Sequence, residues 1–266
     1  MSDASGFEGR SVVITGAAGG IGTALARRFG RDGARIGLLD IDRSALQALA
    51  SDLDQRGIGA LPIECDVTSL GSCRDAVARV VEAHGGVDVL INNAGITHLS
   101  RFSDTEVEVI RRVMEINFFG AVNCTKAALD SLVERRGRIA VLSSVAGFAP
   151  LATRCGYSAS KHALHGFFES LRPELRGSGV RVTVVCPFFV KTEMGERALG
   201  GDGGKPRMPR TQTGTPSDPD WLAEEIHRAV RKGRRLLVPS GGAKLSYLLS
   251  RLAPGAYERI MARRIM

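Results

Sequence analysis

Tyr157 and Lys161 stand at positions i and i+4 of a stretch whose pattern predicts a helix over residues 156–176. This spacing places both side chains on one face of the helix. A free tyrosine, with a pKa of about 10, is a weak base at neutral pH. A nearby ammonium group stabilises the phenolate and lowers that pKa toward the working range. The pair is therefore a candidate acid/base, although the same spacing also occurs by chance.

Two consecutive serines, Ser143 and Ser144, follow the apolar run that begins at Arg138. A hydroxyl at the carboxyl end of a buried strand can reach a substrate oxygen at that edge of a sheet. A serine at a strand end is also a common turn residue. The residues alone leave open which serine, if either, meets a substrate.

The glycine-rich stretch TGAAGGIG at residues 15–22 lies between a predicted strand and a predicted helix. Gly16 permits a tight exit from the strand, Gly20 lets a pyrophosphate approach the backbone, and Gly22 lets helix and sheet pack closely. The N-terminus of the helix offers N–H groups and partial positive charge to phosphates. The spacing is G-x-x-x-G-x-G, and its position between strand and helix predicts a nucleotide site.

Asp40 ends the next apolar run. A carboxylate there accepts hydrogen bonds from the adenosine ribose hydroxyls and repels a 2′-phosphate. The glycine-rich turn also carries no lysine or arginine to hold such a phosphate. These features favour NAD over NADP. Two observations weigh against this preference, since Arg43 is close in sequence and Asp40 is also a plausible turn residue.

Apolar runs alternate with amphipathic stretches, which predicts an α/β fold: a single-domain, Rossmann-like, doubly wound parallel seven-stranded sheet with helices on both faces. The domain spans residues 1–266, with its core at 7–240. The predicted strands are Ser11–Thr15, Arg35–Leu39, Ala60–Glu64, Val87–Ile91, Arg138–Ser143, Val180–Cys186 and Arg235–Val238. The predicted helices cover residues 20–31, 43–56, 69–84, 104–134, 156–176 and 219–232.

Two segments fall outside this alternation. Residues 195–219 are rich in Gly, Pro and Thr, which is typical of a substrate lid or of a passive surface insertion. Residues 244–266 combine apolar and arginine side chains, and Pro254-Gly255 divides them into two short helices. We expect this tail to pack on the domain, over the substrate entrance, or at a subunit interface, in preference to an anionic membrane surface.

Bulk composition excludes several classes of protein. The net charge is +8 at pH 7, but the basic residues form no known nucleic-acid module. The N-terminal stretch has no apolar core typical of a secretory signal, and no run is long enough to span a bilayer. We expect a soluble, cytoplasmic protein with no metal site and with reduced thiols, at Cys65, Cys73, Cys124, Cys155 and Cys186.

Together these motifs resemble the classical short-chain dehydrogenase/reductase family over roughly residues 7–240. The glycine-rich stretch is similar to the family's T-G-x-x-x-G-x-G motif, N-N-A-G stands at residues 92–95, and YSASK at 157–161 resembles Y-x-x-x-K. Ser144, rather than Ser143, has the family's spacing before the tyrosine. The resemblance implies cofactor contacts from Gly16, Gly19, Gly20, Ile21, Gly22, Asp40, Asp66, Val67, Asn93, Ala94, Gly95, Tyr157, Lys161, Pro187, Val190 and Thr192.

The resemblance also implies catalytic roles. Tyr157 would exchange the proton with the substrate oxygen, Lys161 would hold the nicotinamide ribose and lower the tyrosine pKa, and Ser144 would polarise the substrate oxygen. Asn117 would anchor a water that links Lys161 to solvent. The family usually has P-G-x-V-x-T after the sixth strand, where this chain has Phe188 in place of the glycine. That backbone position must therefore avoid a strongly positive φ.

The implied activity is hydride transfer between NAD and an alcohol or ketone. The expected substrate contacts are mostly apolar, which favours a hydrophobic compound: Ser144, Tyr157, Ala146, Phe148, Leu151, Phe188 and Phe189. The resemblance also implies a homodimer or homotetramer formed through the helices at 104–134 and 156–176. The alternatives are a non-catalytic NAD(P)-binding regulator, an NADPH-dependent carbonyl reductase, and a membrane-surface partner protein.

Overall fold

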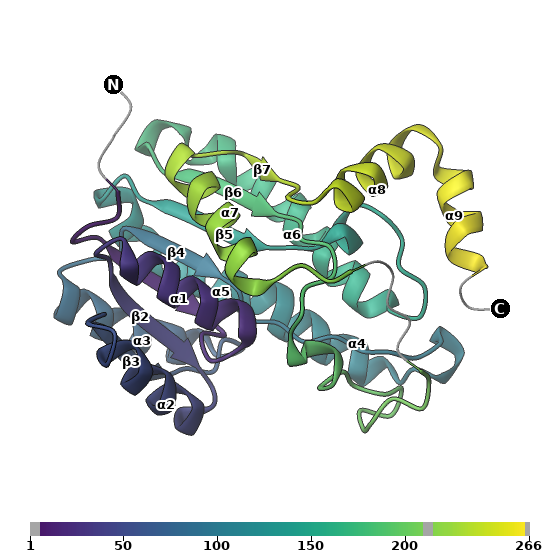
Figure 1. Cartoon of the computed structure of the whole chain (residues 1–266), viewed down its shortest axis with the longest axis horizontal. Helices are drawn as coiled ribbons and strands as arrows, with labels where there is room; N and C mark the ends of the chain where they lie inside the picture. Colours follow the sequence, from purple (N-terminus) through teal and green to yellow (C-terminus); the bar gives the residue numbers. More distant parts are fainter. Residues whose placement is uncertain (1–5, 210–214, 264–266) are drawn as a thin grey trace.

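A computed structural model describes residues 6–209 and 215–263. Its centre is a parallel seven-stranded sheet in the order β3-β2-β1-β4-β5-β6-β7 (Figure 1). The predicted doubly wound fold is confirmed. The strands are β1 (Ser11–Thr15), β2 (Arg35–Asp40), β3 (Ala60–Glu64), β4 (Val89–Asn92), β5 (Arg138–Leu142), β6 (Arg181–Val185) and β7 (Leu236–Leu237).

The strands occur where apolar runs predict them, and the differences lie at their ends. The largest is in β4, which begins at Val89 instead of Val87. Asp88 uses its carboxylate to accept hydrogen bonds from the Ser11 backbone N–H (2.9 Å) and the Arg10 guanidinium (3.0 Å). The Asp88 backbone also reaches both neighbouring strands, since its N–H donates to the Ser11 carbonyl (3.0 Å) and its carbonyl accepts the Arg138 N–H (2.9 Å). The difference therefore concerns only where the strand is counted to begin. β7 is shorter than predicted, since only Leu236 and Leu237 pair with β6.

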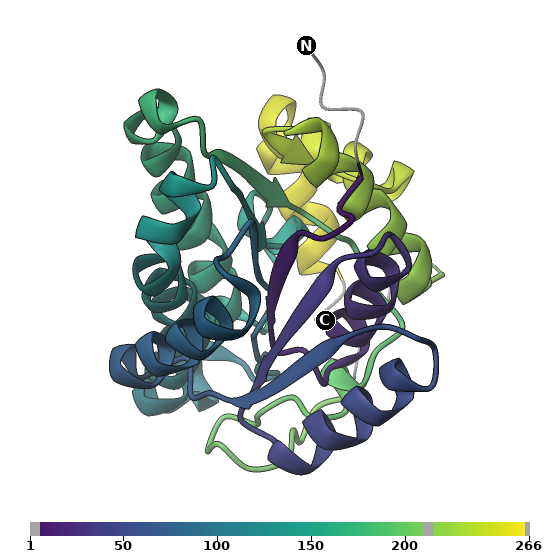
Figure 2. The same cartoon turned by 90° about the vertical axis from the view of Figure 1, so that its left-hand side faces the viewer.

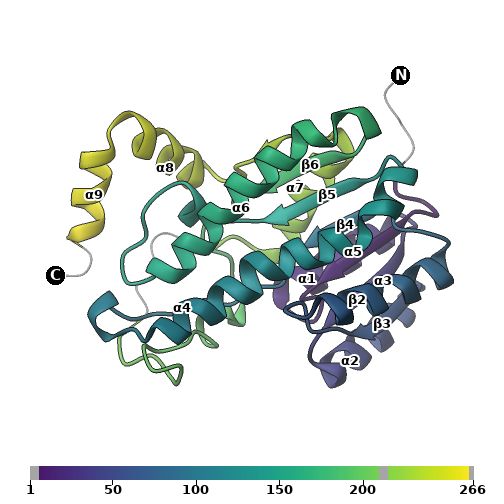
Figure 3. The ribbon, with the colours of Figure 1, turned by 180° about the vertical axis from the view of Figure 1, so that it is seen from behind.

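Helices cover both faces of the sheet, as Figure 2 shows from the side. Apolar side chains of α1, α2 and α7 form one core with β1 and β2. Those of α3, α5 and α6 form the other, on the face seen in Figure 3. The bounds are α1 (Gly20–Arg31), α2 (Arg43–Asp54), α3 (Leu70–His84), α4 (Val107–Met114), α5 (Gly120–Glu134), α6 (Cys155–Glu174) and α7 (Pro219–Lys232).

The single helix predicted over residues 104–134 is wrong in detail. Residues Phe102–Asp104 form a 3-10 turn, and α4 and α5 are separated by a π-helical segment, Glu115–Phe119. Periodicity does not reveal this interruption because a single wider turn leaves the apolar pattern nearly unchanged. Such segments are frequent at functional sites, and this one contains Asn117.

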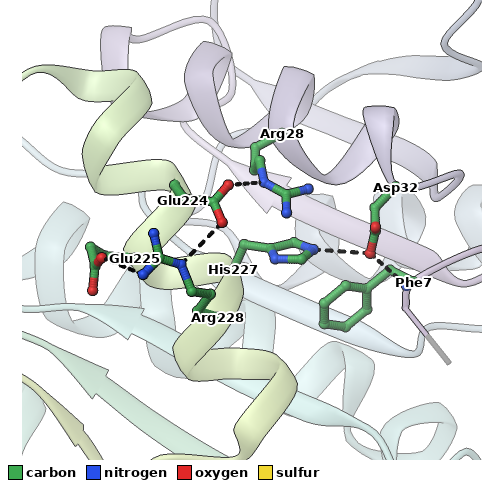
Figure 4. A network of polar contacts seen from close by, with 7 residues as sticks. All are labelled: Phe7, Arg28, Asp32, Glu224, Glu225, His227 and Arg228. Atoms are coloured by element: carbon green, nitrogen blue, oxygen red, sulfur yellow. Dashed lines mark hydrogen bonds and ion pairs between the residues drawn. The ribbon is translucent and has the colours of Figure 1, made fainter. Parts of the chain in front are cut away.

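A polar network joins α7 to α1 at the end of the sheet that contains the start of β1 (Figure 4). The Asp32 carboxylate accepts hydrogen bonds from the Phe7 N–H (2.9 Å) and from His227 Nε2 (3.0 Å). Phe7 and Phe29 lie against the His227 ring. Burial lowers the pKa of His227. The network anchors the N-terminal segment away from the carboxyl ends of the strands.

The C-terminal tail forms an arm of two helices, α8 (Gly241–Leu252) and α9 (Pro254–Ala262), as the Pro254-Gly255 break predicts (Figures 1 and 3). Its inner side packs on the domain: Tyr257 and Met261 are buried in a cluster with Val145 and Ala149. None of the helices in the described ranges is long and apolar enough to cross a membrane.

Candidate active site

The carboxyl ends of the central strands open into a cleft of about 790 Å³. Its walls bring together most of the residues that the sequence assigns to a dinucleotide, along with several that it does not. Predicted residues in the wall are Gly16, Gly19, Gly20, Ile21, Asp40, Asp66, Val67, Asn93, Ala94, Gly95 and Thr192. Lining residues that sequence reasoning missed include Ile41, Asp42, Arg112, Glu115, Met194 and Arg197.

The glycines of the turn are required by close backbone contacts. Gly16 has a φ of +60°, and a Cβ there would lie 2.8 Å from the Cα of Ala94. A Cβ on Gly20 would lie 3.0 Å from Cγ2 of Thr192. A Cβ on Gly22 would lie 2.3 Å from the carbonyl oxygen of Gly16. Gly22 therefore allows α1 to approach the turn itself, where we expected close packing of helix on sheet.

The N-terminus of α1 faces this cleft without a side-chain cap. Its N-cap residue is Gly19, which has no side chain, whereas Asp42 caps α2 through a 3.0 Å hydrogen bond from the Ala45 N–H. The first N–H groups of a helix attract anions when no side chain occupies them. Asp40 lies alongside, and its Oδ2 accepts a hydrogen bond from the Ala18 N–H (3.0 Å).

The N-N-A-G motif stabilises the end of the central strand. The Thr15 hydroxyl accepts hydrogen bonds from the backbone N–H groups of Asn93 and Ala94, both at 3.0 Å. The Asn93 amide in turn donates to the carbonyl oxygens of Thr15 and Gly16, both at 2.9 Å. These bonds fix the turn after β1 against the turn after β4, so the cleft wall is rigid.

Five residues that the sequence assigns to the cofactor do not line this cleft. Gly22 is buried in α1, the Pro187 carbonyl accepts the Val145 N–H, and Val190 pairs with Ser217. Tyr157 lines the neighbouring cavity, and Lys161 is buried beside the cleft.

That neighbouring cavity is small, about 80 Å³. Most of the predicted substrate residues line it, namely Ser144, Tyr157, Ala146, Leu151, Phe188 and Phe189. Phe148 does not, because its ring packs on Tyr247 and His165. Ser144 lies on the cavity, whereas the Ser143 hydroxyl donates to the carbonyl oxygen of Lys161 (3.1 Å) and is buried. The geometry thus agrees with the choice of Ser144 over Ser143.

Burial governs the titration of both members of the Tyr157–Lys161 pair. It raises the pKa of Tyr157, while a hydrogen bond with Ser144 and the charge of Arg154 lower it. Burial also lowers the pKa of Lys161 to about 8. We expected the Lys161 ammonium to lower the tyrosine pKa, but the cation that does so in this chain is Arg154. Lys161 Nζ instead donates to the carbonyl oxygen of Leu142 (2.8 Å).

Asn117 is held on both sides by hydrogen bonds. Its Oδ1 accepts the Ile96 N–H (2.8 Å), and its Nδ2 donates to the Ile96 carbonyl (3.0 Å) and to the Ser160 hydroxyl (2.9 Å). A Cβ on Gly95 would lie 3.1 Å from Asn117 Oδ1 and 3.5 Å from Lys161 Nζ. The side chains of Asn117 and Lys161 therefore meet behind the wall of the cleft at Gly95.

Phe188 occupies the position where the resemblance has glycine. It is absent from the described non-glycine residues with positive φ, which are Arg136 and Thr153, so the expected avoidance of that region is confirmed. Its ring packs on Phe189 (4.9 Å between centroids) and close to Gly242 of α8. Phe188 therefore contacts the C-terminal arm.

The cavity wall also contains residues that sequence reasoning missed: Val145, Ala149, Pro150, Arg154, Tyr257 and Met261. Tyr257 and Met261 come from α9, so the arm covers this cavity. The described part of the 195–219 segment does not line this cavity. Its Arg197 lines the larger cleft, and Leu199 pairs with the chain at His98. The described part of the predicted substrate lid thus borders the larger cleft, and residues 210–214 lie outside the described ranges.

A glycine-lined cleft at the switch point of a parallel sheet, with serine, tyrosine and lysine side chains beside it, defines a Rossmann-like protein with a dinucleotide-type site. The comparisons with known proteins agree. The family model for short chain dehydrogenases matches residues 10–200. Because the match covers more than half of the chain, the protein belongs to the short-chain dehydrogenase family and is an oxidoreductase of that family.

Relatives match the chain almost throughout. It is 37% identical over 266 residues to Dehydrogenase/reductase SDR family member 7B of Danio rerio, covering 97% of this chain and 86% of that protein. It is 38% identical to Dehydrogenase/reductase SDR family protein 7-like of Drosophila melanogaster, covering 96% and 80%. A short chain dehydrogenase/reductase from Burkholderia phymatum, crystallised in complex with NAD, shares the fold with a TM-score of 0.84 and 22% identity, covering 94% and 95%.

Proposed function

We propose that this protein transfers a hydride between NAD and the CH–OH or C=O group of a hydrophobic alcohol or ketone. One observation carries the proposal: Tyr157 and Ser144 share an apolar cavity, while Lys161, one helical turn further along α6, reaches the wall of the adjoining cleft at Gly95. A substrate oxygen in the cavity would therefore meet a phenol and a hydroxyl beside the cofactor.

The cleft fits a dinucleotide. Gly16 and Gly20 leave no room for a Cβ, and α1 presents an uncapped N-terminus suited to a pyrophosphate. Asp40 and Asp42 both line the cleft, and their carboxylates favour ribose hydroxyls over a 2′-phosphate. Arg43 is exposed and is not among the lining residues described. We therefore propose NAD, the nucleotide bound to the Burkholderia phymatum protein, in preference to NADP.

Each of these residues has a separate role in the proposed reaction. Tyr157 moves the proton at its phenolic oxygen, and Ser144 donates a hydrogen bond to the substrate oxygen as negative charge develops there. Lys161, with its pKa lowered to about 8, supplies a cation that can release a proton near neutral pH. Asn117 fixes the chain at Ile96 behind Lys161. When bound, the nicotinamide supplies or accepts the hydride.

The test is turnover of hydrophobic secondary alcohols and ketones with each nicotinamide. Wild type should react with NAD(H), and Tyr157→Phe should bind NADH with little change while losing turnover. Tyr247→Phe, a tyrosine of α8 whose ring contacts Phe148, is the matched control and should keep its activity. Equal turnover in wild type and Tyr157→Phe would contradict the proposal. NADH binding without any turnover in wild type would favour a non-catalytic regulator.

We also propose a homo-oligomer that contacts itself through the α4–α5 and α6 layer. Large apolar side chains are exposed on that layer, namely Val107, Phe119 and Val133. Light scattering of the full chain tests this, and a monomer at micromolar concentration would refute it.

The five cysteines are free, which is consistent with the proposed cytoplasmic location.

The outer face of α8 supports a proposal of peripheral membrane contact. Leu245, Leu248 and Leu252 are exposed on it beside Lys244 and Arg251, and a leucine face flanked by cations suits an anionic bilayer. Cosedimentation of the full chain with phosphatidylserine-containing vesicles tests it. Binding should weaken when the leucines are changed to serine, and equal binding of both chains would refute it.

A further inference from the structure

The wall of the larger cleft carries more negative than positive charge. Among the lining residues that the structure describes, the basic ones are Arg112 and Arg197, and the acidic ones are Asp40, Asp42, Asp66, Glu115 and Glu193. The glycine-rich turn at residues 15–22 contains no lysine or arginine. The linked phosphates of a dinucleotide are anionic, and acidic groups on the wall of a cleft oppose their binding. The two arginines are therefore the side chains that can offset this charge.

Arg197 comes from the side of the cleft that contains the glycine-rich turn. A Cβ on Gly20 would lie 3.0 Å from Cγ2 of Thr192, so the chain after β6 lies directly against the turn. The next residue, Glu193, begins a 3-10 segment, and its carboxylate forms an ion pair with the Arg197 guanidinium. The Arg197 side chain is 75% exposed and that of Glu193 is 67% exposed. Ion pairs this exposed contribute little stability, so a phosphate can replace the carboxylate as the partner of Arg197.

Arg112 comes from the other face of the sheet. It lies on α4, which packs on α6. Ile116, one helical turn further on, lines the same cleft. The side chain of Asn117 fixes this end of the helix to the chain after β4, because its Oδ1 accepts the Ile96 N–H (2.8 Å). Arg112 is exposed and takes part in none of the ion pairs found within residues 6–209 and 215–263. Its charge is thus available to a ligand in the cleft.

We propose that Arg112 and Arg197 bind the pyrophosphate of the dinucleotide from two sides, and that Arg197 leaves Glu193 when the phosphates enter the cleft. A guanidinium group can donate two parallel hydrogen bonds to one phosphate. The uncapped N-terminus of α1 offers its N–H groups to the same phosphates. This inference rests on the proposed function. It adds to the cofactor site two residues that neither the glycine-rich turn nor the family motifs assign.

The first experiment measures binding of ligands with and without a pyrophosphate. NADH is titrated by its fluorescence, and ADP-ribose and adenosine by calorimetry. Arg112→Met and Arg197→Met should each weaken binding of NADH and ADP-ribose by about tenfold. The double variant should weaken it by about a hundredfold, because the two arginines lie on separate elements. Adenosine, which has no phosphate, should bind equally to all of these chains.

Arg111→Met is the control for the loss of positive charge. Arg111 is the exposed neighbour of Arg112 on α4 and does not line the cleft, so this variant should bind NADH as wild type does. An equal loss of adenosine and ADP-ribose binding in the arginine variants would mean that they disturb the cleft as a whole, and would overturn the proposal. A loss found for NADPH but not for NADH would assign the arginines to a 2′-phosphate and would also overturn it.

A second pair of variants tests the competition between Glu193 and the phosphates. Glu193→Gln removes the carboxylate that holds Arg197 and should tighten NADH binding by about two- to threefold. This gain should disappear when Arg197→Met is added, because the carboxylate then has no guanidinium to hold. Glu196→Gln, at an exposed position outside the cleft wall, is the control with the same change in charge. The same gain in both glutamate variants would contradict an exchange of partners at Arg197.

Binding also distinguishes failure of this inference from failure of the proposed function. If wild type binds NADH but turns over no ketone or alcohol, the proposed function fails, and the NADH titrations still decide the role of the two arginines. If wild type does not bind NADH, the ADP-ribose titrations decide it. ADP-ribose binding that is lost in the double variant would support the pyrophosphate site, and no ADP-ribose binding by wild type would refute it.

Discussion

The Nζ of Lys161 lies 5.6 Å from the centre of the Tyr157 ring and donates its hydrogen bond to a main-chain carbonyl. Lysine and phenol thus stand as neighbours on one face of α6, as their i, i+4 spacing predicts. The largest influence on the pKa of each group is nevertheless its own burial, which disfavours the charged form of both groups.

The stability contribution of Lys161 should increase with pH. Burial lowers its pKa from 10.5 to about 8, so between these values the unfolded chain binds more protons than the folded chain. The free energy of unfolding then rises with pH in this window, by roughly 1.4 kcal/mol for each pH unit. Urea denaturation from pH 8 to 10.5 measures the difference between wild type and Lys161→Met, which should grow. Lys126→Met, at an exposed position of α5, is the control. The difference in free energy of unfolding between wild type and this variant should not change with pH.

Asp40 should set the preference between the two nicotinamide dinucleotides. Asp40→Asn keeps an oxygen that can accept the Ala18 N–H but removes the charge that repels a 2′-phosphate. We expect the ratio of kcat/KM for NADPH over NADH to rise by roughly tenfold, equivalent to about 1.4 kcal/mol. The control is Asp54→Asn at the exposed end of α2. A wild type active only with NADPH would refute this role.

Asn117 should matter to stability as well as to turnover. Asn117→Ala removes the partner of the Ile96 N–H, the Ile96 carbonyl and the Ser160 hydroxyl. Each buried group left without a partner costs about 1–3 kcal/mol. Ser160→Ala removes the acceptor of Asn117 Nδ2 and the donor to the Tyr157 carbonyl, and leaves both bonds to Ile96 in place, so it should cost less. The free energy of unfolding in urea measures both variants, and equal losses would show that the contacts with Ile96 contribute nothing.

The arm should limit the size of substrate that the enzyme accepts. A cavity of about 80 Å³ is well below the 300–1,000 Å³ of typical ligand pockets, and Tyr257 and Met261 form part of its wall. The double variant Tyr257→Ala/Met261→Ala should lower KM for bulky ketones relative to small ones. Ile260→Ala is the control, because Ile260 belongs to the same helix and is 41% exposed. An unchanged order of KM values would mean that α9 does not restrict the cavity.

The sequence by itself determined the sheet, the glycine turn and the Tyr157–Lys161 pair, while Ser144 was chosen over Ser143 from the spacing of the family that the chain resembles. The sheet and the pair depend on short-range patterns, namely the alternation of apolar runs and the i, i+4 spacing. The glycine turn was recognised from its place between a strand and a helix. The bounds of β4 were less accurate, because the ends of an element are set by hydrogen bonds to neighbouring strands, such as the bond from Asp88 N–H to the Ser11 carbonyl, that join residues far apart in the chain.

Only the tertiary structure decided which residues surround Ser144, Tyr157 and Lys161. Arg154 borders the cavity because α6 begins beside Thr97, and Tyr257 and Met261 reach it because α9 folds back over the domain. The hydrogen bonds of Asn117 to Ile96 and Ser160 and the contact of Thr192 with Gly20 also join distant segments. No local period encodes such contacts, since they depend on how whole elements pack. The chain thus encodes its reaction class locally, while packing determines which substrate fits.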